Sequence, residues 1–184
     1  MTTVTDRTRR TFVTEEALAI LGRTPATLDT LLRGLPDTWI HVHEGGMTWS
    51  PFEVVGHLIL AERTNWMPRT ATILEHGESR AFDEFTRYPQ FAHTDRRTLS
   101  SLLDEFATVR QESLRMLTGL RPADLDRRGQ HPALGVVTLR QLLSAWVVHD
   151  LDHVMQVTRV LAHQYTDEVG PWREYLRIVR EVPR

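Results

Sequence analysis

The stretch "WVVHDLDHVMQ", residues 146–156, places two histidines four positions apart in a run that otherwise has the composition of a buried helix. An α-helix advances by about 100° per residue, so His149 and His153 lie on one face, one turn apart. Both belong to a stripe roughly 100° wide, which is the width of a face directed at a core. The stripe contains Leu142, Ala145, Trp146, His149, His153, Gln156 and Val160. The stretch therefore predicts a core-facing helix that carries two imidazoles inward.

Capping signals give the start of this helix and of a second one. Thr138 followed by Gln141 forms a capping box, so the first helix is expected to run from about Thr138 to His163. Ser50 and Glu53 form another capping box in "WSPFEVVGHLILAERTNWM", where Pro51 fits the first turn. Pro68 is expected to kink or end that second helix.

Apolar spacing is helical along nearly all of the remaining chain. Further helices are expected at about 15–21, 24–35 and 96–118, with a short one near 171–180. The segments 37–49, 75–94 and 119–137 are expected to be loops or connections. Four long helices without a convincing series of strands predict an all-α fold, a helical bundle with a short extra C-terminal helix.

Length and composition favour one soluble globular domain. The chain has 184 residues, of which 41% are hydrophobic and 25% charged, so we expect a single domain over 1–184 with the bundle core at about 15–163. The net charge of −2 gives no basic stripe for nucleic acid. All 22 basic residues are arginines, which excludes lysine chemistry such as a Schiff base.

The chain contains no cysteine, which excludes disulfides, thiolate catalysis and cysteine-based zinc sites. Any metal must be held by histidine or carboxylate side chains. The N-terminal residues are polar, without the apolar segment of a signal peptide, and no apolar run approaches the roughly 20 residues that cross a bilayer. We therefore expect a cytoplasmic protein that does not enter the membrane.

A third inward histidine completes a candidate metal site. His57 lies on the apolar stripe of the helix that begins after Ser50, so two facing helices can bring His57, His149 and His153 together on one divalent ion. Three protein ligands leave a position open for water or substrate, as in catalytic sites. The alternative is a set of hydrogen-bonded core histidines. The stripe offers few side-chain partners, Gln156 among them, so we prefer the metal site.

The other histidines have simpler interpretations. His41 and His43 precede a Gly-rich segment and could together bind a cation, but such a loop does not preorganise ligands. We instead expect one of them, His43 above all, to line the mouth of the pocket. The remaining ones are expected to be solvated surface residues, namely His76, His93, His131 and His163.

Several neighbours of the three histidines could shape the site. Glu53 shares the stripe of His57 and could be a ligand or base, although its capping role already accounts for it. Asp150 and Asp152 could orient imidazole N–H groups or be solvated charges. A small electrophile is expected to bind against Trp146 and the segment that ends at Trp49.

These motifs resemble the DinB/YfiT-like metalloprotein family. The resemblance covers about residues 15–163 and rests on "TPATLDTLLRGLP", on "WSPFEVVGHL" with His57, and on "HPALGVVTLRQLLSAWVVHDLDHVMQ" with His149 and His153. The order of one histidine followed by H-x-x-x-H is similar to the family's ligand pattern, and all three positions are occupied here.

The resemblance implies an up-down-down-up bundle, one nickel or zinc ion on the three histidines, and a homodimer. It also implies a metal-dependent S-transferase or isomerase that uses a low-molecular-weight thiol, or a hydrolase, acting on a small electrophile. Two alternatives remain open, a metal-stabilised stress-response module without catalysis and a small-molecule-binding module.

A second apolar face on the long C-terminal helix bears on assembly. Val147, Leu151, Val154 and Leu161 cluster nearly opposite the histidines. A helix that is apolar on two faces must bury both or expose a patch that soluble monomers usually avoid. The short C-terminal helix could cover this face, but we favour a second copy of the chain.

Overall fold

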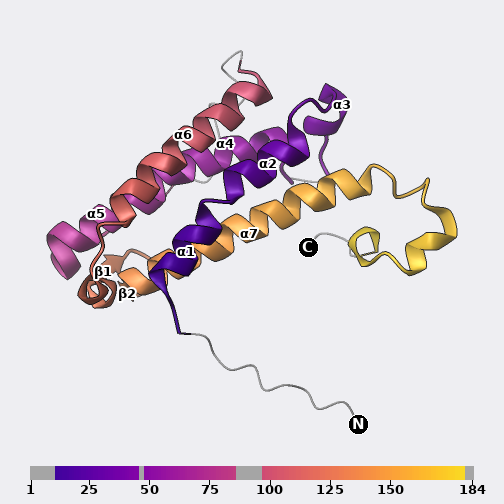
Figure 1. Cartoon of the computed structure of the whole chain (residues 1–184). Helices are drawn as coiled ribbons and strands as arrows, with labels where there is room; N and C mark the ends of the chain where they lie inside the picture. Colours follow the sequence, from indigo (N-terminus) through magenta and orange to yellow (C-terminus); the bar gives the residue numbers. More distant parts are fainter. Residues whose placement is uncertain (1–10, 46–47, 86–96, 181–184) are drawn as a thin grey trace, which may run out of the picture.

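The computed structural model describes residues 11–45, 48–85 and 97–180. Four helical rods make up the molecule (Figure 1). The first is α1 (Thr14–Leu21) followed by α2 (Thr24–Leu32), and the second is α4 (Pro51–Ala61), η1 (Glu62–Trp66) and α5 (Met67–His76). The third and fourth are α6 (Leu99–Leu117) and α7 (Leu139–His163).

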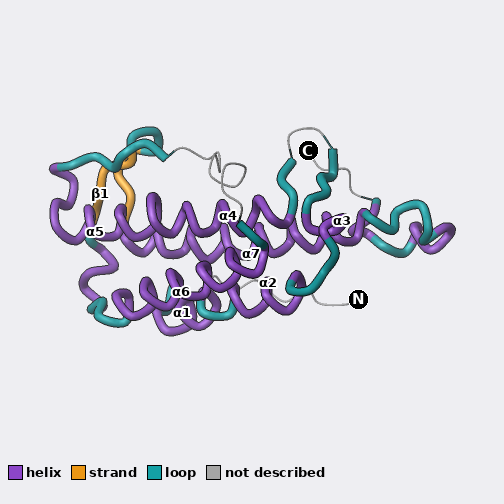
Figure 2. Tube along the Cα trace, turned by 90° about the horizontal axis from the view of Figure 1, so that it is seen from above, coloured by secondary structure: helices purple, strands orange, loops and turns teal. Residues whose placement is uncertain are grey.

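The rods follow an up-down-down-up order. The first and fourth rods run one way along the bundle, and the second and third run the other way (Figure 1). Seen from above, α4, α5 and α7 form one layer, and α1, α2 and α6 form the other (Figure 2). The predicted all-α four-helix bundle is confirmed. None of the helices in the described residues is both long and apolar enough to cross a membrane.

The predicted capping boxes are present. Ser50 Oγ accepts a hydrogen bond from the backbone N–H of Glu53 at 3.3 Å, and the carboxylate of Glu53 accepts one from the backbone N–H of Ser50 at 2.8 Å. Thr138 and Gln141 are paired in the same way at the start of α7. Each pair satisfies backbone donors that a helix leaves without partners in its first turn.

The second rod does not end at Pro68. It passes through the π-helix η1 and continues as α5 to His76, with Pro68 in the first turn of α5. Proline is tolerated there because the first turn of a helix does not need its N–H group. The expected loop at 75–94 therefore starts later, after the 3₁₀ helix η2 (Gly77–Ser79).

Two connecting segments and the C-terminal segment also differ from expectation. The segment 37–49 contains a one-turn helix, α3 (Asp37–Ile40). The connection at 119–137 contains the 3₁₀ helix η3 (Pro122–Asp126) and an antiparallel hairpin of β1 (Arg128–His131) and β2 (Gly135–Thr138). The C-terminal segment forms two 3₁₀ helices, η4 (Gly170–Glu174) and η5 (Arg177–Val179), in place of one α-helix.

Two clusters of buried apolar side chains fill the bundle. One lies among α2, α4 and α6 and includes Phe52 and Phe106, and the other includes Trp66, Trp146 and Leu139. The second apolar face predicted for α7 is partly covered within the chain, because Val147, Val154 and Leu161 pack against these clusters. His93 and Arg96, the latter expected to start the third helix, lie outside the described residues.

Candidate metal centre

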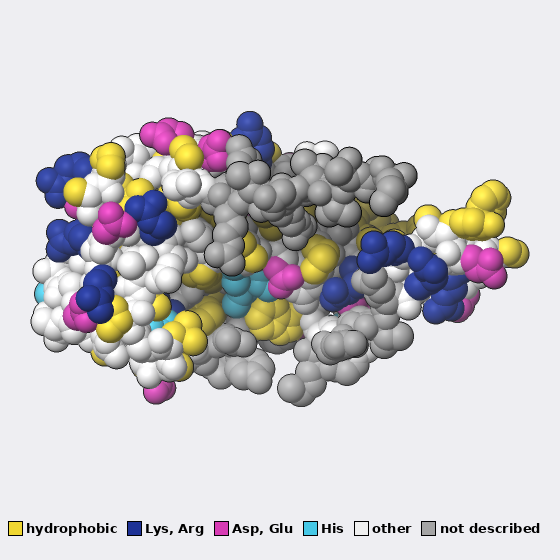
Figure 3. Space-filling view, turned by 90° about the horizontal axis from the view of Figure 1, so that it is seen from below, with side chains coloured by type: hydrophobic (Ala, Val, Ile, Leu, Met, Phe, Trp, Pro, Cys, Tyr) yellow, Lys and Arg dark blue, Asp and Glu magenta, His cyan; other side chains and the backbone are white. Residues whose placement is uncertain are grey.

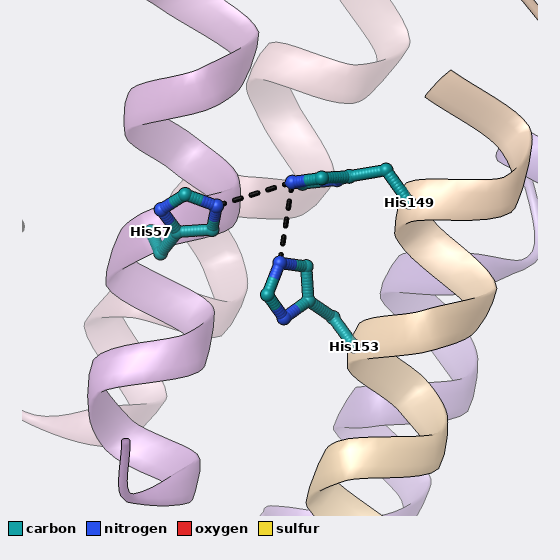
Figure 4. Close-up of side chains that lie close together, drawn as sticks. All are labelled: His57, His149 and His153. Carbon is teal, nitrogen blue, oxygen red and sulfur yellow. Dashed lines mark hydrogen bonds between the residues drawn. The ribbon is translucent and has the colours of Figure 1, made fainter. Parts of the chain in front are cut away.

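Three histidines from two helices point toward one another (Figure 4). His57 comes from α4, and His149 and His153 come from successive turns of α7. His149 Nε2 lies 3.1 Å from His57 Nε2 and 3.2 Å from His153 Nε2. One ring nitrogen of each histidine lies within 4.8 Å of the other two. The structure thus brings together the three side chains that the sequence selected.

The tautomer of His153 fits a cation at this place. Its Nδ1 lies 2.9 Å from the Oε1 of Gln156, which can only accept, so Nδ1 carries the proton and Nε2 presents a lone pair. His149 Nε2 faces both other rings, yet a neutral ring nitrogen either donates one hydrogen bond or accepts with one lone pair. Hydrogen bonds among the three rings therefore cannot account for both short contacts of His149 Nε2. A single ion that accepts one lone pair from each ring would account for them.

The spacing fits as well. Zinc binds imidazole nitrogen at about 2.0–2.1 Å in tetrahedral sites, which places two ligand nitrogens about 3.3 Å apart. The two short nitrogen–nitrogen distances of 3.1 and 3.2 Å are close to that value. The residues present are therefore suited to hold a divalent ion.

Burial favours the neutral form of the site. His57 and His153 are 3% and 8% exposed. Burial, together with the neighbouring His149, lowers the pKa of His153 to about 4, even though Gln156 acts in the opposite direction. His153 is consequently neutral at pH 7, which is the form that binds metal.

A buried network of charges lies behind His149. Arg110 of α6 donates hydrogen bonds from Nη1 to Asp150 Oδ2 at 2.6 Å and from Nε to Glu62 Oε1 at 3.0 Å. The second carboxylate oxygen of Asp150 lies 3.9 Å from His149 Nδ1. Burial would raise the pKa of Asp150, but its contacts with His149 and Arg110 outweigh burial and lower the pKa. Asp150 is therefore a buried ion-pair partner and not a solvated charge.

The histidines open onto a cavity of about 1100 Å³. Its wall includes all three of them, the rings of Trp49 and Trp66, and His131 from β1. In the space-filling view from below, histidine side chains are visible near the middle of the molecule with hydrophobic side chains around them (Figure 3). The site is thus built next to a space large enough for a small molecule.

Two tryptophans contact the histidines, and only one of them was expected. The ring of Trp49 lies 4.4 Å from that of His57 and is stacked 5.9 Å from that of His153. Trp146 is fully buried and does not line the cavity. It stacks on Trp66 at 5.6 Å, and Trp66 meets His149 edge-on at 5.1 Å. Trp146, which was expected to lie against the bound electrophile, thus lies behind Trp66 and meets the histidines only through that ring.

The loop histidines do not reach the cavity. His43 Nδ1 lies 2.6 Å from the carbonyl oxygen of Thr48 and 3.5 Å from Glu53 Oε2, and His41 packs against the ring of Phe52. Neither lines the cavity, and Glu53 caps α4 without lining it. His131, expected to be a solvated surface residue, lines it instead.

Sequence reasoning also missed polar residues on the second rod. Asn65 and Arg69 line the cavity beside Trp66. Their spacing from His57 gave no clear signal, because at about 100° per residue an α-helix would place Asn65 about 80° and Arg69 about 120° away from His57 around the helix axis. The π-helix η1 lies between His57 and Arg69 and changes this phase.

Comparisons with known proteins agree with this architecture. The family model of the DinB superfamily matches residues 20–157. YfiT from Bacillus subtilis, described as a probable metal-dependent hydrolase with an unusual four-helix bundle topology, is similar with a TM-score of 0.74 at 18% identity over 85% of this chain and 91% of its own.

A second solved structure, TT2238, described as a four-helix bundle protein, is similar with a TM-score of 0.53 at 18% identity over 79% of this chain and 98% of its own. No curated protein matches the sequence. Because the family model covers well over half of the chain, the chain belongs to the DinB superfamily.

Proposed function

We propose that the chain is a metal-dependent enzyme in which His57, His149 and His153 bind one divalent ion, zinc or nickel. The observation that supports this most directly is the placement of their ring nitrogens, all within 4.8 Å, on the wall of a cavity of about 1100 Å³. When bound, an ion held by three imidazoles supplies Lewis acidity and activates a nucleophile near neutral pH.

The chain's own residues prepare the site for a small electrophile. Gln156 fixes the orientation of His153 through the 2.9 Å contact at Nδ1. The rings of Trp49 and Trp66 flank the imidazoles and give the cavity apolar walls that bind a small molecule and limit water. The reaction is either hydrolysis or transfer to a low-molecular-weight thiol, which must be a co-substrate because the chain has no cysteine.

The cavity favours an enzyme over a metal-stabilised module without catalysis. A structural metal site is closed by four protein ligands, whereas a catalytic site keeps a position open. The three histidines face a common space, and His149 keeps 24% of its side chain exposed. This leaves room for a substrate beside the three histidines, which a purely structural metal site does not need.

The test is a panel of esters and of alkylating electrophiles, the latter with and without added thiols, assayed before and after treatment with a chelator. We expect activity that chelation abolishes and that zinc or nickel restores. His153→Ala should lack this activity, while the exposed His76→Ala should keep it. Activity that survives chelation, or that His153→Ala retains in full, would contradict the proposal.

We propose further that the chain forms a homodimer through α7. Val148, Leu151 and Met155 lie at helical spacing on one face and are 64%, 50% and 52% exposed. Three large apolar side chains exposed together on a helix favour burial against another surface. A two-fold contact pairs this face with its own copy.

A further inference from the structure

Arg69 is a buried cation on the wall of the cavity. It lies on α5, lines the cavity with the three histidines, and is 9% exposed. No carboxylate in the described part of the chain lies within ion-pair distance of it. Its one hydrogen bond is long, from Nη2 to the carbonyl oxygen of Asp83 at 3.4 Å, and its guanidinium lies 5.3 Å from the ring centre of Phe82.

A buried charge of this kind is costly unless something pairs with it. The guanidinium stays charged in proteins, so burial without a counterion leaves the charge uncompensated. Its Nε is buried and makes no hydrogen bond to any residue that the structure describes. Burial also lowers the pKa of Arg69, because it disfavours the charged form of the guanidinium. The other buried arginine of the bundle core, Arg110, is by contrast paired with both Glu62 and Asp150.

A second polar group without a partner lies one turn earlier on the same wall. Asn65 lines the cavity and is 5% exposed, and its buried Oδ1 has no hydrogen-bond partner within the described ranges of the chain. The oxygen and nitrogen of a side-chain amide exchange places on rotation, so Asn65 can present either a donor or an acceptor. Asn65 is also part of the π-helix η1, and such helices are frequent at functional sites.

We propose that Arg69 and Asn65 bind a carboxylate group of the small molecule that the cavity takes. The planar guanidinium matches a carboxylate with two parallel hydrogen bonds, and the amide of Asn65 adds a donor. A monoanion suits the site better than a phosphate, because Arg69 is the one arginine among the described residues that line the cavity, while Glu84 and Asp152 also line it. A dianion would meet repulsion from those two carboxylates.

The same cavity holds the three histidines, so the carboxylate would anchor a molecule whose other end reaches them. That this molecule is the substrate rests on the proposed function, whereas carboxylate binding at Arg69 does not require a metal. Zinc or nickel would itself attract carboxylates, and the test is therefore made on protein freed of metal by a chelator as well as on the loaded protein.

The experiment compares benzoate with benzamide, its uncharged counterpart, by isothermal titration calorimetry. We expect metal-free wild type to bind benzoate at least tenfold more tightly than benzamide. Arg69→Gln should weaken benzoate binding at least tenfold and leave benzamide binding unchanged, and Asn65→Leu should weaken it severalfold. Arg115→Gln, which removes an exposed arginine of α6, is the matched control and should bind as the wild type does.

Thermal unfolding of Arg69→Gln separates binding from a structural role. Removal of a buried charge without a counterion should leave the Tm unchanged or raise it, whereas a Tm lowered as by truncation of a core residue would identify Arg69 as structural and overturn the proposal. Equal benzoate binding by Arg69→Gln and wild type, or no saturable binding by the wild type, would also overturn it. Tighter binding of phenyl phosphate than of benzoate would overturn the assignment to a carboxylate.

Failure of the carboxylate-binding proposal can be distinguished from failure of the proposed metal-dependent function. If the proposed function fails, metal or metal-dependent activity is absent, and benzoate binding by the metal-free protein still depends on Arg69. If the present proposal fails, Arg69→Gln retains its metal by elemental analysis and binds benzoate as the wild type does.

Discussion

The side-chain oxygen of Gln156 lies 2.9 Å from Nδ1 of His153, three residues earlier on α7. This contact sets which nitrogen of His153 carries the proton, and it leaves Nε2 directed at His149 with its lone pair. Residues that orient a metal ligand in this way contribute to affinity without touching the ion.

Gln156→Leu should therefore lower the affinity for zinc by roughly tenfold, within the range found when such orienting groups are removed. Competition with a chromogenic chelator measures the change. Gln111→Leu, at an exposed position of α6, is the matched control and should bind zinc as the wild type does. Equal affinities of Gln156→Leu and wild type would show that the contact at His153 does not support binding.

Acid should destabilise the metal-free protein through His153. The pKa of His153 is about 4 in the folded chain, against 6.5 for an ordinary histidine. Between these values the unfolded chain binds more protons, so the free energy of unfolding falls as the pH falls. From pH 7 to pH 5 the loss due to His153 is about 2 kcal/mol. Bound metal makes the fall steeper, because protons then also compete with the ion.

Urea unfolding at the two pH values, in the presence of a chelator, measures this loss. His153→Gln should show a pH dependence smaller by about 2 kcal/mol, which is the share of His153. His76→Gln, which removes an exposed histidine, should behave as the wild type. Identical pH dependence in wild type and His153→Gln would contradict the lowered pKa.

Arg110 should be essential for stability. Arg110→Met leaves the buried carboxylates of Glu62 and Asp150 without their counterion, and such a change costs about 3–5 kcal/mol of unfolding free energy. Arg115→Met on the exposed side of the same helix should change it by less than about 0.5 kcal/mol. Chemical denaturation of both variants is the measurement, and a loss for Arg110→Met no larger than for the control would refute this role.

The homodimer is tested best at Leu151. This side chain is 50% exposed, whereas Val154 packs against the core, so a charge at Val154 would disturb the fold as well as an interface. We expect the wild type to sediment as a dimer at micromolar concentration and Leu151→Arg to sediment as a folded monomer. A monomeric wild type would rule out the dimer, and a dimeric Leu151→Arg would exclude this face as the contact.

The parts of the fold that sequence predicted are those that depend on local rules. Ser50 with Glu53, and Thr138 with Gln141, satisfy backbone donors within four residues of chain, so the starts of α4 and α7 can be read directly. The π-helix η1 could not be predicted from such local signals. Its first residue, Glu62, is paired with Arg110, 48 residues away, and the sequence around Glu62 contains no sign of that partner.

In the histidine site, too, local sequence predicted some features, whereas others depend on contacts between distant segments. His149 and His153 share a face because of their spacing, and His57 faces inward because its own helix is apolar around it. Which tryptophan lines the cavity depends instead on how the second rod packs against α7. Trp146 lies on the predicted stripe, but the stacked ring of Trp66 separates it from the cavity. His131 reaches the cavity because residues 128–138 form a hairpin, which the periodicity of that segment did not predict.

The central claim is that His57, His149 and His153 together bind one divalent ion. Elemental analysis of the purified protein, after loading with zinc and removal of free metal, tests it most directly. We predict about one zinc ion per chain in the wild type and in His76→Ala, and far less than one in each of His57→Ala, His149→Ala and His153→Ala. Full occupancy in any one of these three variants, or none in a folded wild type, would contradict the claim.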